Sequence, residues 1–312
     1  MFTVKIQAHV LQLVARDAGD DEIGRWTYPT HTPETLNFIK PGDESNIRFK
    51  ENEDEYRIEV GELIYVFDKQ NGQLEKVRAY GHSIPLSKGP VFVSREKTVE
   101  DVKVFKNKNG SMSITAIYKQ KADSITWTIQ KTGLLNLYVA YQPAHDAAYA
   151  GISFSFPEDM VKTMEWMGKG PFRVWKNRIV GTNVGVWEKE YNNTITGHKG
   201  FKYPEFKGYH AEMYWANLKC KQGKGFKVYF KSNDIFFRLF TPDQPENPRS
   251  TVVDFPKGDI SFLHGINPIG TKFKETRNLG PHSSTYYFSP KKIKGRKLRM
   301  KLIFDFRNST TY

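Results

Sequence analysis

The feature that most constrains the fold of this chain is the alternation of apolar and polar residues along most of its length. Apolar residues occupy every second position at Tyr56, Ile58 and Val60, and the pattern repeats at Leu63, Tyr65 and Phe67. Successive side chains of a β-strand point to opposite faces, so a period of two predicts half-buried strands. Further alternating runs are SMSITAIYK, SITWTIQ, LLNLYVAYQ, GISFSF, GFKVYFK, DIFFRLF and KLRMKLIFDF.

Turn residues join these runs at short spacing. Asn71-Gly72 is a strong hairpin signal, and Lys131-Thr132-Gly133 joins SITWTIQ to LLNLYVAYQ. Helical periodicity is nearly absent, and the only candidate helices, 158–166 and 17–23, are short. Many closely spaced strands without intervening helices predict an all-β chain, a large antiparallel sandwich with few short helices.

A change in composition near the N-terminus predicts two parts. The segment 30–44, THTPETLNFIKPGDE, is rich in turn residues and resembles a linker. The one or two strands before it are too few to bury a core of their own. We therefore expect residues 1–44 to be a short β-segment and linker, the remnant or completion of another module, and residues 45–312 to form the main domain.

The chain is basic, with 47 Lys and Arg against 34 Asp and Glu, which gives a net charge of +13. Such a charge favours anionic partners. The cations are dispersed except in KKIKGRKLRMK, residues 291–301, which we interpret as a solvated edge strand and not as a nucleic-acid site. No run of about eighteen apolar residues occurs, so no membrane span is expected.

The sequence gives little support for metal or cofactor chemistry. The single cysteine, Cys220, lies in a strand-like run and is expected to be buried. His145-Asp146, His210 with Glu212, and His264 fit no recognised metal-ligand spacing. Neither a phosphate-binding glycine loop nor a nucleophile elbow is present in the sequence, so we expect no cofactor and no metal.

The segment 165–187, EWMGKGPFRVWKNRIVGTNVGVW, combines aromatic residues, cations and turn residues. Rigid aromatic rings together with guanidinium donors suit a surface that stacks on a sugar and hydrogen-bonds its hydroxyls. The alternative is a structural turn whose aromatic residues belong to the core. We expect Trp166, Trp187, Trp215 and Trp127 to be core residues, because each lies in or ends an alternating run.

Three blocks in order resemble the C-terminal domain of family-two glycoside hydrolases of the β-galactosidase type. They are EYRIEVGELIYVFDKQNGQLEKV, then ISFSFPEDMVKTMEWMGKGPFRVWKNRIVGTNVGVW, then YPEFKGYHAEMYW, and GDISFLHGINPIGTKF follows where that family has a glycine-rich loop and an aromatic residue. The resemblance spans about residues 49–306. It implies a β-supersandwich similar to galactose mutarotase, the domain that makes up much of the small chain in two-chain β-galactosidases.

This resemblance implies that the chain forms a wall of a carbohydrate site while a separate (β/α)₈ barrel, in another domain or subunit, supplies the catalytic glutamates. No alternating strand–helix pattern occurs here, so we predict no catalytic residue in this chain. Phe273 is the nearest match to the family's sugar-contacting aromatic. The predicted carbohydrate-binding residues are Arg173, Trp175, Arg178, Glu205, His210 and Phe273.

Several of these residues depart from the family pattern. Arg173 replaces an acidic residue and Trp175 a tyrosine. Glu205 and Phe206 occupy positions where the family has glutamine and glutamate, and His210 occupies the position of an arginine. Our hypothesis is an acidic or decorated glycan as the ligand, because three cations, Arg173, Lys176 and Arg178, and the net charge would suit it.

Two alternative functions follow from the same residues. One is an autonomous carbohydrate-binding module on this scaffold. The other is a polysaccharide lyase or mutarotase-type enzyme acting in the sandwich cleft, where Arg173, Arg178, Tyr209 and His210 would neutralise a uronate and move a proton.

Overall fold

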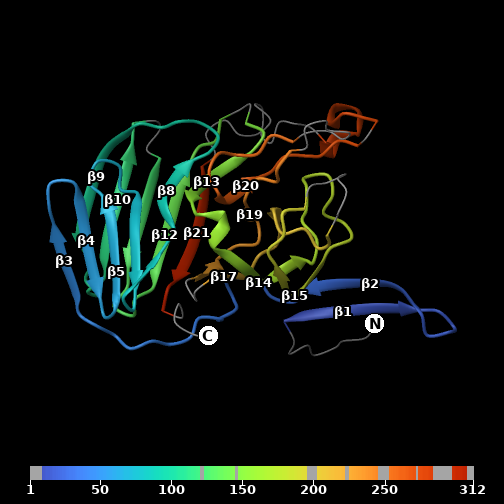
Figure 1. The fold of residues 1–312 in the computed structure, drawn as a ribbon, viewed down its shortest axis with the longest axis horizontal. Coiled ribbons are helices and arrows are strands. Elements are labelled where there is room, and N and C mark those ends of the chain that lie inside the picture. The colour runs from blue at the N-terminus through green and yellow to red at the C-terminus, as the bar shows by residue number, and fades with distance from the viewer. Residues whose placement is uncertain are drawn as a thin grey trace.

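The computed structural model of the chain describes residues 9–119, 123–144, 147–194, 202–221, 225–244, 253–271, 273–283 and 297–307 (Figure 1). All strand pairings in this part of the chain are antiparallel, and the described helical elements are single 3₁₀ turns. The prediction of an all-β antiparallel sandwich is therefore confirmed. Within the same residues, no helix has the length and hydropathy needed to cross a membrane.

One layer is a ten-stranded sheet in the order β16-β19-β20-β13-β8-β6-β5-β4-β3, with β7 paired to β6. Its strands are β3 (Ile47–Glu51), β4 (Glu55–Val60), β5 (Leu63–Asp68), β6 (Leu74–Ala79), β7 (His82–Ile84), β8 (Ser87–Phe92), β13 (Ala150–Ser155), β16 (Gly208–His210), β19 (Phe236–Leu239) and β20 (Ile260–Gly265).

The other layer is a nine-stranded sheet in the order β15-β14-β17-β18-β21-β12-β11-β10-β9. Its strands are β9 (Val99–Lys106), β10 (Met112–Tyr118), β11 (Ser124–Ile129), β12 (Leu135–Tyr141), β14 (Val161–Gly170), β15 (Asn183–Glu190), β17 (Trp215–Cys220), β18 (Phe226–Phe230) and β21 (Leu298–Asp305).

An aromatic core joins the two sheets. Trp127 of β11 lies 5.8 Å from Phe67 of β5 and 6.1 Å from Phe154 of β13, measured between ring centroids. Phe154 in turn lies 5.8 Å from Phe304 of β21. All four rings are fully buried, as expected for residues on the inner faces of packed sheets.

The other expected core residues have mixed outcomes. Cys220, Trp127 and Trp166 are buried, which confirms those predictions. Trp215 is also buried, in a small separate cluster. Trp187 is only partly buried, because it lies on β15 at the edge of its sheet.

The two helix predictions are wrong. Residues 158–160 form one 3₁₀ turn, and β14 takes the remainder of the 158–166 segment. Residues 17–21 form the turn of a hairpin and the following residues belong to its second strand. Glu, Met and Lys in β14 are helix formers, but this preference is small in energy. Pairing of β14 with β15 on one side and β17 on the other outweighs it.

The basic run at 291–301 was predicted to be an edge strand. Residues 291–296 lie outside the described part of the chain, but β21 lies between β18 and β12, in the interior of its sheet. Arg299 and Lys301 face outward and alternate with the buried Met300 and Leu302. The cations therefore mark the solvated face of an inner strand, and the edge prediction is wrong here.

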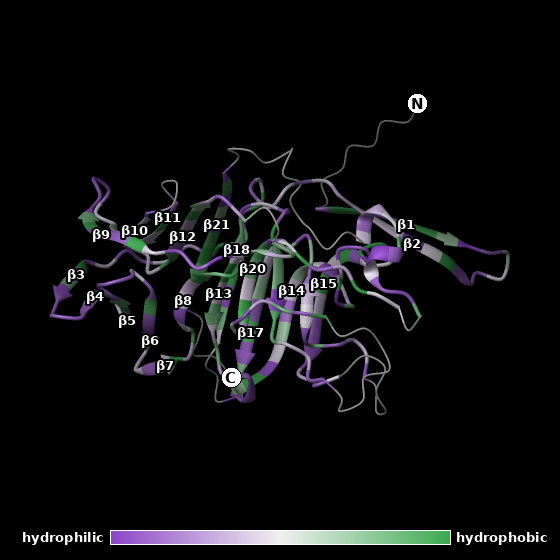
Figure 2. Cartoon of the chain, turned by 90° about the horizontal axis from the view of Figure 1, so that it is seen from above, coloured by the Kyte–Doolittle hydropathy of each residue, from purple (hydrophilic) through white to green (hydrophobic). Residues whose placement is uncertain are grey.

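The N-terminal strands form a separate hairpin of β1 (Val10–Arg16) and β2 (Glu22–Pro29), which lies beside β15 at one end of the molecule (Figures 1 and 2). Val184 N of β15 donates to Thr27 Oγ1 over 2.6 Å, and Tyr214 Oη donates to His31 O over 2.8 Å. Residues 30–46 contain no strand and connect the hairpin to β3.

We expect Gly151→Ala to destabilise the fold strongly. Gly151 follows a register shift between β13 and β20, and an added Cβ would lie 2.1 Å from Phe262 O and 2.7 Å from Leu263 Cα. The strands must separate, which we expect to lower the free energy of unfolding by about 3 kcal/mol in urea denaturation. Gly19→Ala is the control, because its Cβ would approach nothing closer than 3.3 Å. Equal effects of the two changes would contradict the packing described here.

Candidate functional site

The aromatic and basic segment identified in the sequence is the connection between β14 and β15, residues 171–182. Val174 N donates to Tyr209 O over 2.8 Å, which fixes the connection against β16. A tight turn follows, in which Arg178 N donates to Trp175 O over 2.8 Å. The segment therefore connects β14 and β15 of one sheet and pairs with β16 of the other.

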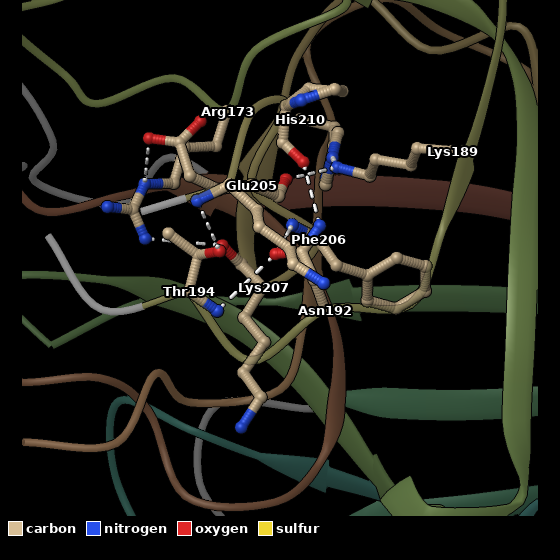
Figure 3. Close-up of polar contacts among 10 residues, drawn as sticks. Arg173, Lys189, Asn192, Thr194, Glu205, Phe206, Lys207 and His210 are labelled. Atoms are coloured by element: carbon tan, nitrogen blue, oxygen red, sulfur yellow. Dashed lines mark hydrogen bonds and ion pairs between the residues drawn. The ribbon is translucent and has the colours of Figure 1, made fainter. Parts of the chain in front are cut away.

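A buried ion pair lies at the base of this connection (Figure 3). Arg173 Nε is 3.5 Å from Glu205 Oε1, and both side chains are at least nine-tenths buried. Arg173 Nη1 also donates to Lys207 O over 3.4 Å. Gly208 has a φ of +123°, and a Cβ there would lie 2.8 Å from Arg173 Cδ, so a glycine is required beside the guanidinium.

A second cation, Lys189 of β15, lies next to this pair. Its Nζ donates to Glu205 O over 2.6 Å and lies 2.6 Å from His210 Nε2, which accepts from the amine (Figure 3). The rings of Trp166 and Phe206 lie 5.1 and 5.5 Å from Nζ. Such a dry setting favours the neutral amine over the ammonium ion.

Burial determines the protonation of this cluster. Desolvation lowers the pKa of Lys189 to about 7, with Glu205 opposing and Arg173 adding to the shift. Desolvation, followed by the charge of Lys189, also lowers the pKa of His210 well below its ordinary value. His210 is therefore neutral at pH 7 and serves as a hydrogen-bond acceptor.

The strand and loop around Glu205 are held by a further polar shell. Asn192 Nδ2 donates to Pro204 O over 3.0 Å, and Asn192 Oδ1 accepts from Phe206 N over 3.4 Å (Figure 3). Lys207 Nζ is 2.5 Å from Glu158 Oε1, which also accepts from Tyr191 Oη. The segment 204–208 is therefore fixed at several points.

Trp175 belongs to an adjacent aromatic cluster. Its ring centroid lies 5.6 Å from that of Tyr209 and 5.5 Å from that of Phe255. The guanidinium carbon of Arg173 lies 5.4 Å from the Trp175 ring. Trp175 is 7% exposed, so most of its surface packs inside the protein.

Asn177 connects the β14–β15 loop to the loop that carries Phe273. Its amide nitrogen donates to Ile269 O and Ser283 Oγ, both over 2.9 Å, and its Oδ1 accepts from Ile269 N over 2.9 Å. Arg178 Nη2 donates to Gly270 O over 3.2 Å. Phe273, a few residues further on, is 86% exposed.

The structure thus divides the six predicted residues into two groups. Arg173, Glu205 and His210 meet in the buried cluster around Lys189. Trp175 and Arg178 lie in the turn that supports the Phe273 loop. Their role in binding carbohydrate stays a prediction.

Sequence reasoning missed Lys189 and Asn177. Lys189 was detectable, because it lies two positions from both Trp187 and Tyr191 and so shares their inward strand face. Asn177 gave no such signal, since its partners are more than ninety positions away along the chain.

The chemistry available to the cluster is hydrogen bonding and charge, without a metal set. No group of three His, Cys, Asp or Glu that could hold a metal ion occurs among the described residues, and His145-Asp146 lies outside them. Glu205 Oε2 and the Tyr209 hydroxyl are buried without a hydrogen-bond partner. Arg173 is buried, and its positive charge is paired with the carboxylate of Glu205.

Comparison with known proteins places this arrangement in a family. A family model described as beta galactosidase small chain matches residues 59–241. The chain belongs to the β-galactosidase small-chain family. The matched region contains the β14–β15 connection and the Lys189 cluster, whereas the Phe273 loop follows it.

The crystal structure of a putative aldose 1-epimerase from Escherichia coli K12 is similar at 10% sequence identity and a TM-score of 0.36, covering 81% of this chain and 99% of that chain. The search of curated proteins found no match.

Two positions that depart from the pattern expected from the resemblance are paired in the structure. Arg173 stands where an acidic residue was expected and Glu205 where a glutamine was expected, and the structure pairs them. A buried charge requires a partner, and Glu205 provides one for Arg173. The pair also accounts for one of the three cations on which the acidic-glycan hypothesis rested.

The low pKa of Lys189 predicts a pH dependence of stability. An unfolded lysine keeps its proton up to about pH 10.5, whereas Lys189 in the folded chain releases it near pH 7. The unfolded state binds more protons between these values, so the free energy of unfolding rises with pH from 7 toward 10.5. We expect Lys189→Met to remove this gain, roughly 1–3 kcal/mol between pH 7 and pH 9.

Urea denaturation at pH 7 and pH 9 measures the difference. Lys219→Met is the matched control, because the Lys219 side chain is 46% exposed and its change should leave the slope intact. Parallel pH profiles for the wild type and Lys189→Met would refute the prediction.

Proposed function

We propose that this chain is a non-catalytic part of a β-galactosidase-like glycoside hydrolase and forms a carbohydrate-facing wall of an active site whose catalytic groups belong to a larger chain. The observation that carries the proposal is the small-chain family match over residues 59–241. That name describes one chain of an enzyme, and a small chain needs a large one.

The architecture supports placing bond cleavage elsewhere. Retaining glycosidases need two carboxyl groups about 5–5.5 Å apart, held by a scaffold such as the (β/α)₈ barrel of about 250 residues. The described residues form antiparallel sheets instead. In the buried cluster, Glu205 is paired with Arg173 and is not free to act as an acid or a nucleophile.

The Phe273 loop supports the contact with sugar. Its ring is 86% exposed, and Asn177 and Arg178 donate to the backbone at Ile269 and Gly270, shortly before it in the chain. A rigid exposed ring can stack on a pyranose without a large loss of conformational freedom. With Arg173 neutralised by Glu205, we favour a neutral galactoside over an acidic glycan as the ligand.

The N-terminal hairpin supports association with the larger chain. Leu11 pairs with Tyr28 and Leu13 with Trp26 on one face, and all four are 38–51% exposed. A two-stranded hairpin is marginal by itself, so an apolar face of this kind requires cover. We propose that residues 1–44 complete a module of the catalytic chain, while residues 45–312 form the sandwich domain.

A groove lies on the other face of the hairpin, where β1 contributes Val10 and Gln12. Its volume is about 570 Å³, and it is lined mainly by apolar residues of β1, β14, β15 and β17, with Lys227 at one side. Lys227 Nζ lies 4.0 Å from the centroid of Trp215, which directs the amine over an aromatic face. The groove gives the larger chain a place to insert apolar side chains.

The first test is reconstitution. The purified chain should not hydrolyse o-nitrophenyl β-galactoside, and mixing it with a barrel-bearing large chain of a two-chain β-galactosidase should yield activity. Phe273→Ala should then lower kcat/KM about tenfold, the loss of one stacked ring, while assembly is unchanged. Phe49→Ala is the control, since Phe49 is exposed on β3 at the far edge of the ten-stranded sheet. Hydrolysis by the isolated chain would overturn the proposal.

The second test concerns the hairpin. Leu13→Asp with Trp26→Asp places two charges in the apolar face, and we expect at least a tenfold weaker association with the catalytic chain in sedimentation velocity. The thermal midpoint of the isolated chain should change little, because both side chains are about half exposed. Val180→Asp, at a fully exposed loop position, is the control. Unchanged association would exclude the hairpin from the interface.

A further inference from the structure

Two exposed aromatic residues meet at the entrance of the loops that hold the Arg173–Glu205 pair. Phe172 directly precedes Arg173, and Tyr203 lies two residues before Glu205. Their ring centroids are 5.8 Å apart and their planes are inclined at 84°. Phe172 is 42% and Tyr203 is 65% exposed, so the rings form a corner that is open to solvent.

The backbone on both sides of this corner is fixed. Arg173 holds the Phe172 side through Glu205 and Lys207 O. Asn192 holds the Tyr203 side by donating to Pro204 O, and Lys189 donates to Glu205 O. Two rings that are exposed but supported by buried polar contacts are pre-organised for a ligand.

The size of the exposed surface distinguishes between kinds of ligand. The exposed fractions of the two rings sum to about one aromatic side chain, on the order of 150–250 Å². A stable protein interface buries about 800 Å² on each partner, so this corner alone is too small for one. It matches one or two sugar rings, whose apolar C–H faces pack on aromatic faces while their hydroxyls stay in water.

We propose that Phe172 and Tyr203 form a carbohydrate subsite, in which a pyranose ring stacks on Tyr203 and contacts Phe172 with its edge. The inference rests on the proposed function in taking a saccharide as the ligand class, and it uses neither Phe273 nor Arg178. The Arg173–Glu205 pair then has a positioning role, since it holds the two segments that carry the rings.

Saturation-transfer-difference NMR with the full chain tests this subsite. The probes are lactose and a β-1,4-linked galactotetraose, titrated to obtain Kd. We expect the Phe172→Ala, Tyr203→Ala double variant to bind the tetraose about tenfold more weakly or not detectably, a loss of about 1.4 kcal/mol or more. Tyr203→Phe keeps the ring and should retain binding. Phe105→Ala, an exposed ring on β9, is the matched control and should bind as the wild type does.

Three results would overturn the subsite: unchanged affinity in the double variant, no binding of either saccharide by the wild type, or unchanged saccharide affinity with weakened assembly with the catalytic chain. The last result would assign the corner to a protein contact. Reconstituted hydrolysis by the wild-type chains tests the proposed function separately, so that failure of the subsite leaves it standing. Thermal unfolding of each variant verifies that it is folded.

Discussion

The structure depends on aromatic packing between its two sheets. Trp127, Phe154 and Phe304 are in edge or tilted contact across the sandwich, which keeps large side chains dry without long aliphatic stretches. This contact sets the spacing of the layers. Because β13 and β20 lie in one layer and β14 and β15 in the other, that spacing fixes where the loops from each layer meet.

The loops meet in one buried polar cluster. Arg173, Glu205, Lys189 and His210 are buried together, and burial penalises every charge among them. The cluster tolerates this because the Arg173 charge is paired and Lys189 gives up its proton near neutral pH. The cluster holds the two segments from which Phe172 and Tyr203 project into solvent.

Much of the fold was predictable because strand periodicity is local. Runs such as SITWTIQ and LLNLYVAYQ became β11 and β12 joined by the expected turn. β14 was missed because helix-favouring residues within it conceal pairing partners that are distant in sequence. The site was predictable only in part: the cations of the β14–β15 loop were visible, but the partner that neutralises Arg173 lies in a separate block of the sequence. Pairing across that separation depends on the tertiary fold and not on local pattern.

The Arg173–Glu205 pair also restricts how such a chain can diverge. Placing an acidic residue at position 173 alone would set two buried carboxylates against each other, and placing a glutamine at position 205 alone would leave a buried guanidinium without its counterion. Loss of one partner of a buried pair costs about 3–5 kcal/mol, a large share of the stability of an ordinary domain. Evolutionary exchange between the two charge arrangements must therefore change both positions nearly together, and homologues should carry one arrangement or the other as an inherited unit.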